Sequence, residues 1–177
     1  MGKNLLRKVL WFSKRIKYEI DFFDILQPQR AVREDSRYKS GVFFSAKCNR
    51  NIQYESGLEL NFIKQLEQSD EVTFYWEQPC SVTYTRGKIR DKYTPYFALY
   101  LKSKEIVIVE IKTLPDMLDH RVQTKMEGLI KFCSMKGFGL LLTDGKDTID
   151  KIRKYKYNRN LEKAILNAVA DNRILYK

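Results

Sequence analysis

The sequence contains few of the residues that bind transition metals or form disulfides. Among its 177 residues there are 3 cysteines and 1 histidine. The cysteines Cys48, Cys80 and Cys133 are isolated and odd in number, which argues against a disulfide framework or a zinc site and predicts a reducing, cytoplasmic location. With His120 alone, a histidine-rich metal site is excluded and a Ser-His-Asp triad is disfavoured. A hydrolytic metal site would have to use carboxylates, which favours Mg²⁺ or Mn²⁺.

Proline is scarce and long apolar runs are absent. The chain has 4 prolines, 44% hydrophobic residues and 31% charged residues. This composition is globular and excludes a disordered or collagen-like chain. No apolar run reaches the roughly 18 to 20 residues that are needed to span a bilayer, so we expect no membrane span. The length suffices for one domain with its own core.

Basic residues are in clear excess. Lysine and arginine total 33 against 22 aspartates and glutamates, which gives a formal net charge of +11 at pH 7. Such an excess favours a polyanionic partner, above all nucleic acid. Basic residues are concentrated at 1–17, 30–50 and 151–159. The residues that we expect to contact DNA are Arg37, Lys39, Lys47, Arg50, Lys151, Arg153, Lys154 and Lys156.

The pattern of apolar residues predicts a mixed α/β domain. Ser56 can cap a helix that runs to about Gln68. We expect strands at 41–45, 72–76, 80–85, 93–101, 105–113 and 138–143, with a turn at 86–88. The strand at 105–113 should be central, because both of its faces begin apolar. A helix over about 116–134 would connect the last two strands as a parallel, right-handed crossover unit. Its apolar residues at helical spacing include Leu129, Ile130 and Cys133, and Gly137 would stop the helix.

We expect three parts along the chain. Residues 1–50 would form a basic amphipathic helix (1–17) followed by a basic arm, and residues 51–146 would form the core. Residues 147–177 would add two basic helices, at about 147–157 and 160–170, that pack on this core.

Two opposite charges end the central strand. Glu110 and Lys112 are separated by one residue, so their side chains point to the same side of the sheet. A carboxylate there can bind a divalent cation, and the lysine can orient water or stabilise negative charge on a phosphate. By itself, this Glu-x-Lys pattern is explained equally well by a strand that leaves the core.

Other segments give this pair a context. They are Ser56-Gly57-Leu58-Glu59 at a helix start, Glu77-Gln78-Pro79, and Tyr93-Thr94-Pro95-Tyr96-Phe97 before Val109-Glu110-Ile111-Lys112. This series, over roughly residues 38–145, resembles the PD-(D/E)XK nuclease superfamily, and within it most the TnsA endonuclease subunit of heteromeric transposases. It is also similar to phage Holliday-junction resolving endonucleases and to phage head-completion nucleases.

The resemblance implies a restriction-endonuclease-like mixed sheet flanked by helices, and a metal-dependent DNA endonuclease that uses Mg²⁺ or Mn²⁺. It makes Lys112 the catalytic lysine. The groups that would hold the metal are the carboxylates of Glu59 and Glu110 and the carbonyl of Ile111. Without the resemblance, Glu59 would be interpreted as an exposed charge on a helix.

The resemblance also implies neighbours of the site and partners. Gln78 would lie near the site, and Glu55 is the substitute candidate for Glu59. The expected partners are DNA together with transposase and ATPase-regulator subunits, or else phage proteins.

One position departs from the family pattern. Where the pattern has Thr-Pro-Asp-Phe, this chain has Tyr96 in place of the aspartate. That aspartate is the central metal ligand of the family, and a neutral phenol is a poor ligand for Mg²⁺. Replacement by Asp91, Asp116 or Asp119 is disfavoured by their expected positions.

Three interpretations of Tyr96 therefore stay open. The chain is a catalytically inactive DNA-binding or structural relative, or an enzyme whose ligand has migrated, or a nuclease altered on purpose at this residue. In the first and third cases we expect weak or no cleavage by the chain as written.

Overall fold

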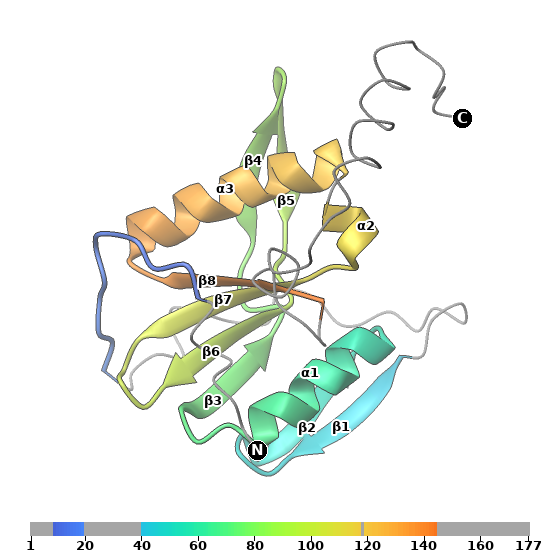
Figure 1. The fold of residues 1–177 in the computed structure, drawn as a ribbon, viewed down its shortest axis with the longest axis vertical. Coiled ribbons are helices and arrows are strands. Elements are labelled where there is room, and N and C mark those ends of the chain that lie inside the picture. Colours follow the sequence, from blue (N-terminus) through green and yellow to red (C-terminus); the bar gives the residue numbers. More distant parts are fainter. Residues whose placement is uncertain (1–8, 20–39, 118, 145–177) are drawn as a thin grey trace, which may run out of the picture.

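The computed structural model describes residues 9–19, 40–117 and 119–144, apart from the side chain of Leu114 (Figure 1). In chain order the elements are β1 (Gly41–Ser45), β2 (Arg50–Tyr54), α1 (Gly57–Glu67), β3 (Val72–Glu77), β4 (Val82–Arg86), β5 (Ile89–Tyr93), β6 (Phe97–Leu101), β7 (Ile106–Ile111), α2 (Leu114–Met117), α3 (His120–Lys136) and β8 (Gly139–Thr143). The predicted helices at 147–157 and 160–170 lie outside the described residues. So do the expected DNA contacts Arg37, Lys39, Lys151, Arg153, Lys154 and Lys156.

A four-stranded mixed sheet in the order β3-β6-β7-β8 forms the centre of the fold. β6 is antiparallel to both β3 and β7, whereas β7 and β8 are parallel. All six residues of β7 are buried, so the prediction of a central strand is confirmed. The other four strands form two antiparallel hairpins, β1–β2 and β4–β5. The predicted α/β class is also confirmed.

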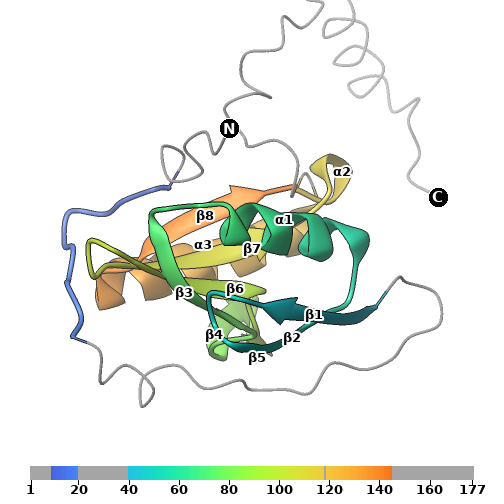
Figure 2. The same ribbon diagram turned by 90° about the horizontal axis from the view of Figure 1, so that it is seen from below.

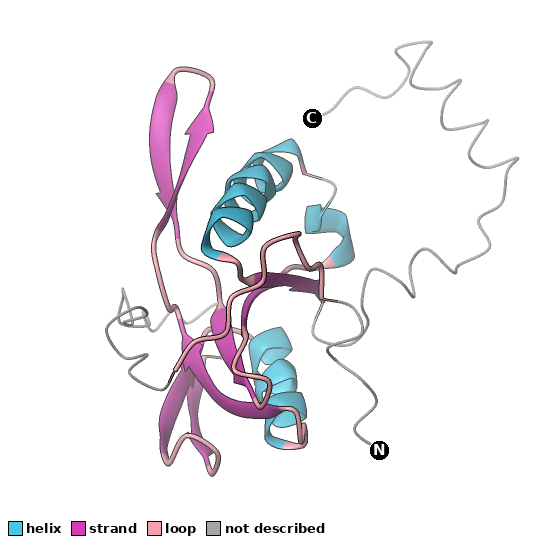
Figure 3. Cartoon of the chain, turned by 90° about the vertical axis from the view of Figure 1, so that its left-hand side faces the viewer, coloured by secondary structure: helices cyan, strands magenta, loops and turns pink. Residues whose placement is uncertain are grey.

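Helices cover both faces of this sheet (Figures 2 and 3). On one face, Phe62 of α1 packs with the β7 side chains Val107 and Val109. On the other face, Leu129 of α3 packs with Ile108 of the same strand. Because successive side chains of a strand point to opposite sides, β7 contributes to both cores. Among the described helices, none combines the length and the apolarity that a membrane crossing requires.

The strand predicted at 93–101 is confirmed for residues 97–101, but its predicted start is wrong. β5 ends at Tyr93 and β6 begins at Phe97. β5 follows the predicted turn at 86–88 and pairs with β4 instead of joining the central sheet. Its five residues are exposed except for the half-buried Tyr93, so apolar periodicity carried no signal for this strand.

The predicted helix at 116–134 is two helices. α2 ends at Met117, and Asp119 caps α3 by accepting a hydrogen bond from the backbone N–H of Arg121 at 2.7 Å. Ile130, which was expected on the buried side, is 39% exposed. The predicted stop at Gly137 is confirmed, because this residue ends α3 in the left-handed conformation with φ of 72°.

The basic helix predicted for 1–17 is wrong for its described part, residues 9–17. This segment runs along the outer edge of β8, where Leu10 and Leu140 exchange backbone hydrogen bonds of 2.8 and 3.0 Å. Trp11 packs into the core on the α1 side and Phe12 into the core on the α3 side, which is the alternation of an extended chain. The edge of β8 supplies backbone partners that a sequence pattern does not reveal.

The contact between α3 and the β4–β5 hairpin depends on a residue without a side chain. A Cβ atom on Gly128 would lie 2.5 Å from Cβ of Tyr84. We therefore expect Gly128→Ala to lower the free energy of unfolding by about 1 to 3 kcal/mol, although alanine favours helices. Gly57→Ala is the matched control, since nothing lies within 4 Å of its Cβ position. Urea denaturation measures both, and equal stabilities of the two variants would contradict the close packing.

Candidate functional site

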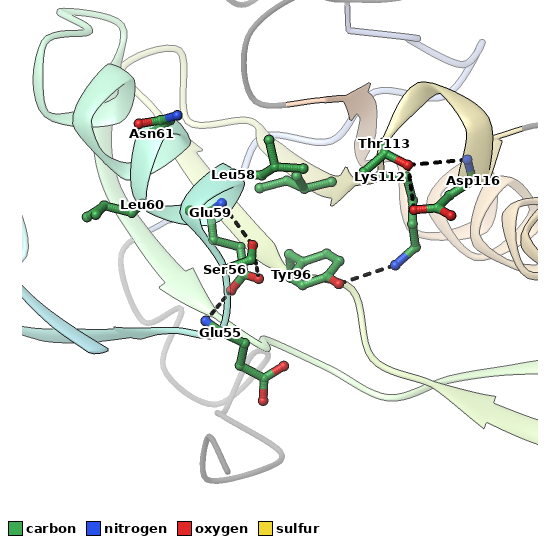
Figure 4. Close-up of a pocket in the computed structure, with 12 residues that line it drawn as sticks. Glu55, Ser56, Leu58, Glu59, Leu60, Asn61, Tyr96, Lys112, Thr113 and Asp116 are labelled. Atoms are coloured by element: carbon green, nitrogen blue, oxygen red, sulfur yellow. Dashed lines mark hydrogen bonds between the residues drawn. The ribbon is translucent and has the colours of Figure 1, made fainter. Parts of the chain in front are cut away.

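A groove with a volume of ≈ 840 Å³ opens between the start of α1 and the end of β7 (Figure 4). Its walls come from three separate parts of the chain: the N-terminus of α1, the residue before β6, and the segment that leaves β7. The polar residues that line it include Glu55, Ser56, Glu59, Tyr96, Lys112 and Asp116. The fold therefore brings Glu59, Tyr96 and Lys112 to one place.

Glu59 is part of the cap of α1. Ser56 accepts a hydrogen bond from the backbone N–H of Glu59 at 3.2 Å and donates its hydroxyl to Oε1 of Glu59 at 2.8 Å. The backbone N–H of Glu55 donates to Oε2 at 2.9 Å. This arrangement is similar to a capping box, but the Glu59 carboxylate accepts from the N–H of Glu55, one residue before the cap residue Ser56. The cap predicted at Ser56 is confirmed. Glu59 stabilises the start of α1, independently of any chemical role in the groove.

The interpretation of Glu59 as an exposed helix charge is wrong, because the residue is only 5% exposed. Burial raises the pKa of this carboxyl above its usual value, and the hydrogen bonds from Glu55 and Ser56 offset part of the rise. Glu59 is thus a buried carboxyl in the wall of the groove.

Glu110 lies at the end of β7 with no exposed surface. Lys112 Nζ is 3.1 Å from its Oε1, but neither carboxylate oxygen accepts a hydrogen bond of good geometry from the described residues. Burial raises the pKa of Glu110 to about 7, although Lys112 and the nearby Tyr93 phenol lower it in part. Near neutral pH the Glu110 carboxyl therefore populates both its protonated and its ionised form.

Tyr96 stands next to this pair. Lys112 Nζ donates a hydrogen bond to the Tyr96 hydroxyl at 3.2 Å and lies 4.7 Å from the centre of the ring, a cation–π distance. Burial raises the pKa of Tyr96, and the carboxylates of Glu110 and Glu59 add to the rise. The phenol is therefore neutral at physiological pH and occupies the middle of the cluster.

The backbone holds Tyr96 at the end of the sheet. Its N–H donates to the carbonyl of Val109 at 3.1 Å, and its carbonyl accepts from Gln78 at 2.8 Å. Gln78, expected near the site, is thus a direct neighbour of Tyr96. A second cavity of ≈ 270 Å³ is lined by Gln78, Tyr93, Tyr96 and Glu55, so Glu55 and Tyr96 border both spaces.

The three aspartates considered as possible metal ligands in place of Tyr96 lie in different parts of the fold. Asp91 lies on β5 and accepts a hydrogen bond from Tyr84, and Asp119 caps α3. Asp116 lines the groove, where its carboxylate accepts from the Thr113 hydroxyl at 2.6 Å. The prediction that Asp116 lies away from the site is wrong. α2 begins at Leu114, soon after β7 ends at Ile111, and so Asp116 stays beside the groove.

Tyr93 was not recognised as a site residue from the sequence. Its hydroxyl is buried next to Glu110 and has no hydrogen-bond partner of good geometry within the described residues. The sequence feature that could have identified Tyr93 as a site residue is its position three residues before Tyr96, with Pro95 between them.

Two expected DNA contacts have intramolecular partners. The Arg50 guanidinium forms two hydrogen bonds with the Glu77 carboxylate, at 2.6 and 2.9 Å. Lys47 Nζ donates to the backbone carbonyl of Ser69 at 2.8 Å. Both residues fasten the β1–β2 hairpin to the rest of the core, a different task from the one predicted.

The donors present do not match the site that Mg²⁺ prefers. Both oxygens of Glu59 take part in the helix cap, and Oε1 of Glu110 contacts Lys112. No three acidic, histidine or cysteine side chains within residues 9–19, 40–117 and 119–144 converge as a metal site. Magnesium favours several oxygen ligands in octahedral geometry, and the phenol of Tyr96 is not an anionic one.

No model of a known protein family matches the chain, and no curated protein matches it either. The roles of the residues in the groove must therefore be argued from their own geometry.

Glu110→Gln tests the cost of burying this carboxyl. An acid whose pKa is raised by folding destabilises the folded state progressively as pH rises from its unfolded value toward its folded one, about 7. Glutamine has no such cost. We expect the stability of Glu110→Gln relative to the unmodified chain to increase between pH 5 and pH 8, by up to about 3 kcal/mol.

Urea denaturation at several pH values measures this difference. The exposed Glu71→Gln serves as control and should show no such trend. A difference for Glu110→Gln that stays constant over this pH range would contradict the assigned burial.

Proposed function

We propose that this protein binds DNA through a PD-(D/E)XK-like endonuclease site in which Tyr96 prevents metal-dependent cleavage. The observation that carries the proposal is the contact of Lys112 Nζ with both Glu110 and Tyr96, at 3.1 and 3.2 Å. The resemblance places a carboxylate, a lysine and an aspartate together at this point. Here the first two are present, and a phenol stands for the third.

Lys112 keeps the property that phosphate binding needs. Burial alone would lower its pKa, but Glu110 and Tyr96 raise it on balance, so the ammonium group stays charged. The side chain is 19% exposed and lines the groove. A phosphodiester that enters the groove would meet this cation, and binding would not require the missing aspartate.

Hydrolysis of a phosphodiester requires more than binding it. The attacking water and the leaving oxygen need stabilisation that carboxylate-bound metal ions provide in this class of enzyme. Tyr96 offers a neutral hydroxyl, and it holds Lys112 in a hydrogen bond. The same residue therefore accounts for binding without efficient cleavage.

The resemblance also suggests a context. The chain would act in the cytoplasm as a relative of the endonuclease subunit of a heteromeric transposase, with transposase and ATPase-regulator partners. The alternative within the same fold is a phage resolving or head-completion nuclease. Neighbouring genes would separate these two contexts.

Restoring the carboxylate is the direct test. We expect Tyr96→Asp to nick or cut DNA in Mg²⁺ or Mn²⁺ at least about 10²-fold faster than the unmodified chain, the scale seen when one catalytic group is removed or restored. Linear, supercoiled and branched DNA are the substrates, and gel electrophoresis of the products is the measurement.

Tyr96→Asn is the matched control, because it has the shape of aspartate without its charge and should remain inactive. Lys112→Ala in the Tyr96→Asp background should lose the gained activity. Equal cleavage by the aspartate and asparagine variants, both shown to be folded, would contradict the proposal.

A second candidate function, an active nuclease with a migrated ligand, is favoured by one observation. Asp116 lines the same groove as Glu59 and Lys112 and is exposed. In that case the unmodified chain cuts DNA in Mn²⁺, and Asp116→Asn lowers the rate about 10²-fold. Asp70→Asn, at an exposed loop residue, is the control. Activity that is unaffected by Asp116→Asn would eliminate this candidate.

A further inference from the structure

We propose that the β4–β5 hairpin is a ribbon that binds the DNA backbone and directs it toward the groove. This inference rests on the DNA binding proposed above and adds the surface through which it occurs. The residues concerned lie outside the basic stretches that the sequence singled out. They are Lys88, Arg90 and Lys92, with Arg86 close to the tip on the other face.

The hairpin projects from the body of the molecule (Figures 1 and 3). Neither of its strands pairs with the central sheet, and its most extensive contact with the core is the one between β4 and α3. From Lys92 to the tip at Lys88, a strand of this kind extends roughly 14 Å. A two-stranded ribbon of this form is narrow enough to enter the major groove of duplex DNA.

The two faces of the hairpin differ in chemistry. One face is turned toward α3, where Val82 and Tyr84 are buried and Tyr84 meets Gly128. The other face carries two cross-strand pairs, Thr83 with Lys92 and Thr85 with Arg90, and all four residues are exposed. Threonine hydroxyls, guanidinium and ammonium groups are the side chains that contact DNA phosphates.

The cations of the hairpin form no ion pair among the residues that the structure describes, although the backbone N–H of Lys92 and the nearby charge of Arg86 both lower the pKa of Asp91. Four basic residues occur within residues 86–92. The one acid among them, Asp91, points to the α3 face and accepts a hydrogen bond from Tyr84 at 3.0 Å. In contrast, Arg50 and Lys104 are paired with glutamates. Acidic residues opposite the basic ones would stabilise the strand pair, because opposite charges attract across it. Lys92 and Arg90 instead lie opposite Thr83 and Thr85.

The basic face leads to the groove. Lys92 lines the second cavity together with Gln78 and Tyr96, and Lys112 lies on the other side of Tyr96 in the main groove. A polyanion that lies along Lys88, Arg90 and Lys92 would therefore arrive at Lys112. The connection between the hairpin and the site is short, since only residues 94–96 separate β5 from β6.

The chemistry favours nucleic acid over a membrane surface. Among residues 82–93, Ile89 at the tip is the one large apolar side chain that is strongly exposed, at 59%. Interfacial binding to lipid needs a substantial apolar face in addition to charge. Lysines on a free strand edge also oppose aggregation, and this purely protective role is the alternative that the experiment must exclude.

The first experiment removes charge at matched positions. The hairpin variant is Lys88→Gln/Arg90→Gln/Lys92→Gln, and the control is Lys64→Gln/Lys102→Gln/Lys131→Gln, which removes the same charge from exposed residues of the core. Binding of the unmodified chain and both variants to duplex DNA is measured by fluorescence anisotropy over a range of salt concentrations. Circular dichroism verifies that all three are folded.

We expect the hairpin variant to bind about 10- to 100-fold more weakly at low salt. Its plot of log affinity against log salt should be shallower by about 2 to 3 units, since each phosphate contact contributes about 0.9. The control should change affinity less than about threefold and keep its slope, because general charge acts weakly at a distance in salt.

The second experiment locates the DNA. A thiol-reactive photo-crosslinker is attached to Ile89→Cys, at the hairpin tip, or to Met135→Cys, near the end of α3. The two native side chains have similar exposure, 59% and 61%. We expect the native thiols to react slowly, because Cys48 and Cys133 are buried and burial raises the pKa of all three cysteines. Labelling of the unmodified chain measures this background. We expect DNA to cross-link at position 89 and not at 135.

The outcomes separate this inference from the proposed function. If the chain binds DNA but both triple variants weaken binding equally, or if position 135 cross-links as well as position 89, the hairpin is not the contact surface. If the hairpin variant behaves as expected while Tyr96→Asp does not cut, the hairpin binds DNA and the nuclease interpretation alone fails. If the chain binds anionic vesicles and no duplex DNA, both proposals are overturned.

Discussion

The buried carboxyl of Glu110 is the constraint on which the site depends. A fully buried acid at the end of a central strand requires either a proton or a neighbouring cation. Lys112 supplies the cation, and the Tyr96 hydroxyl in turn accepts a hydrogen bond from Lys112. The start of β6 is therefore tied to the end of β7 by side chains as well as by the sheet. The groove therefore has polar residues in its wall, although the sheet that carries them is apolar.

Several residues of the groove have structural and chemical roles at once. Glu59 completes the cap of α1 and also lines the cavity, so its loss would disturb the helix before any chemistry is considered. Tyr96 packs against the core on the α1 side and holds Lys112. Helix capping and packing therefore maintain much of the wall of the groove, whatever binds there.

Local patterns predicted the elements whose contacts are close in sequence. The cap at Ser56, the stop at Gly137 and the apolar strand at 106–111 depend on hydrogen bonds and side-chain alternation within one segment. One failure occurred where a distant segment decides the conformation: residues 9–19 are extended because β8 offers them an edge. β5 was missed for another reason. Its partner β4 is close in sequence, but almost all side chains of β5 are exposed, so no apolar alternation marks it as a strand.

The sequence by itself determined which chemical groups are available: a Glu-x-Lys pair at the end of a central strand, a glutamate at a helix start, and a tyrosine directly after Pro95. Only the tertiary structure decided which of them meet. It placed Asp116 in the groove and Asp91 outside it, joined Arg50 to Glu77, and left the cations of the β4–β5 hairpin unpaired among the described residues. The physical reason is that such contacts depend on strand order, register and helix ends, which bring together residues that no sequence spacing relates.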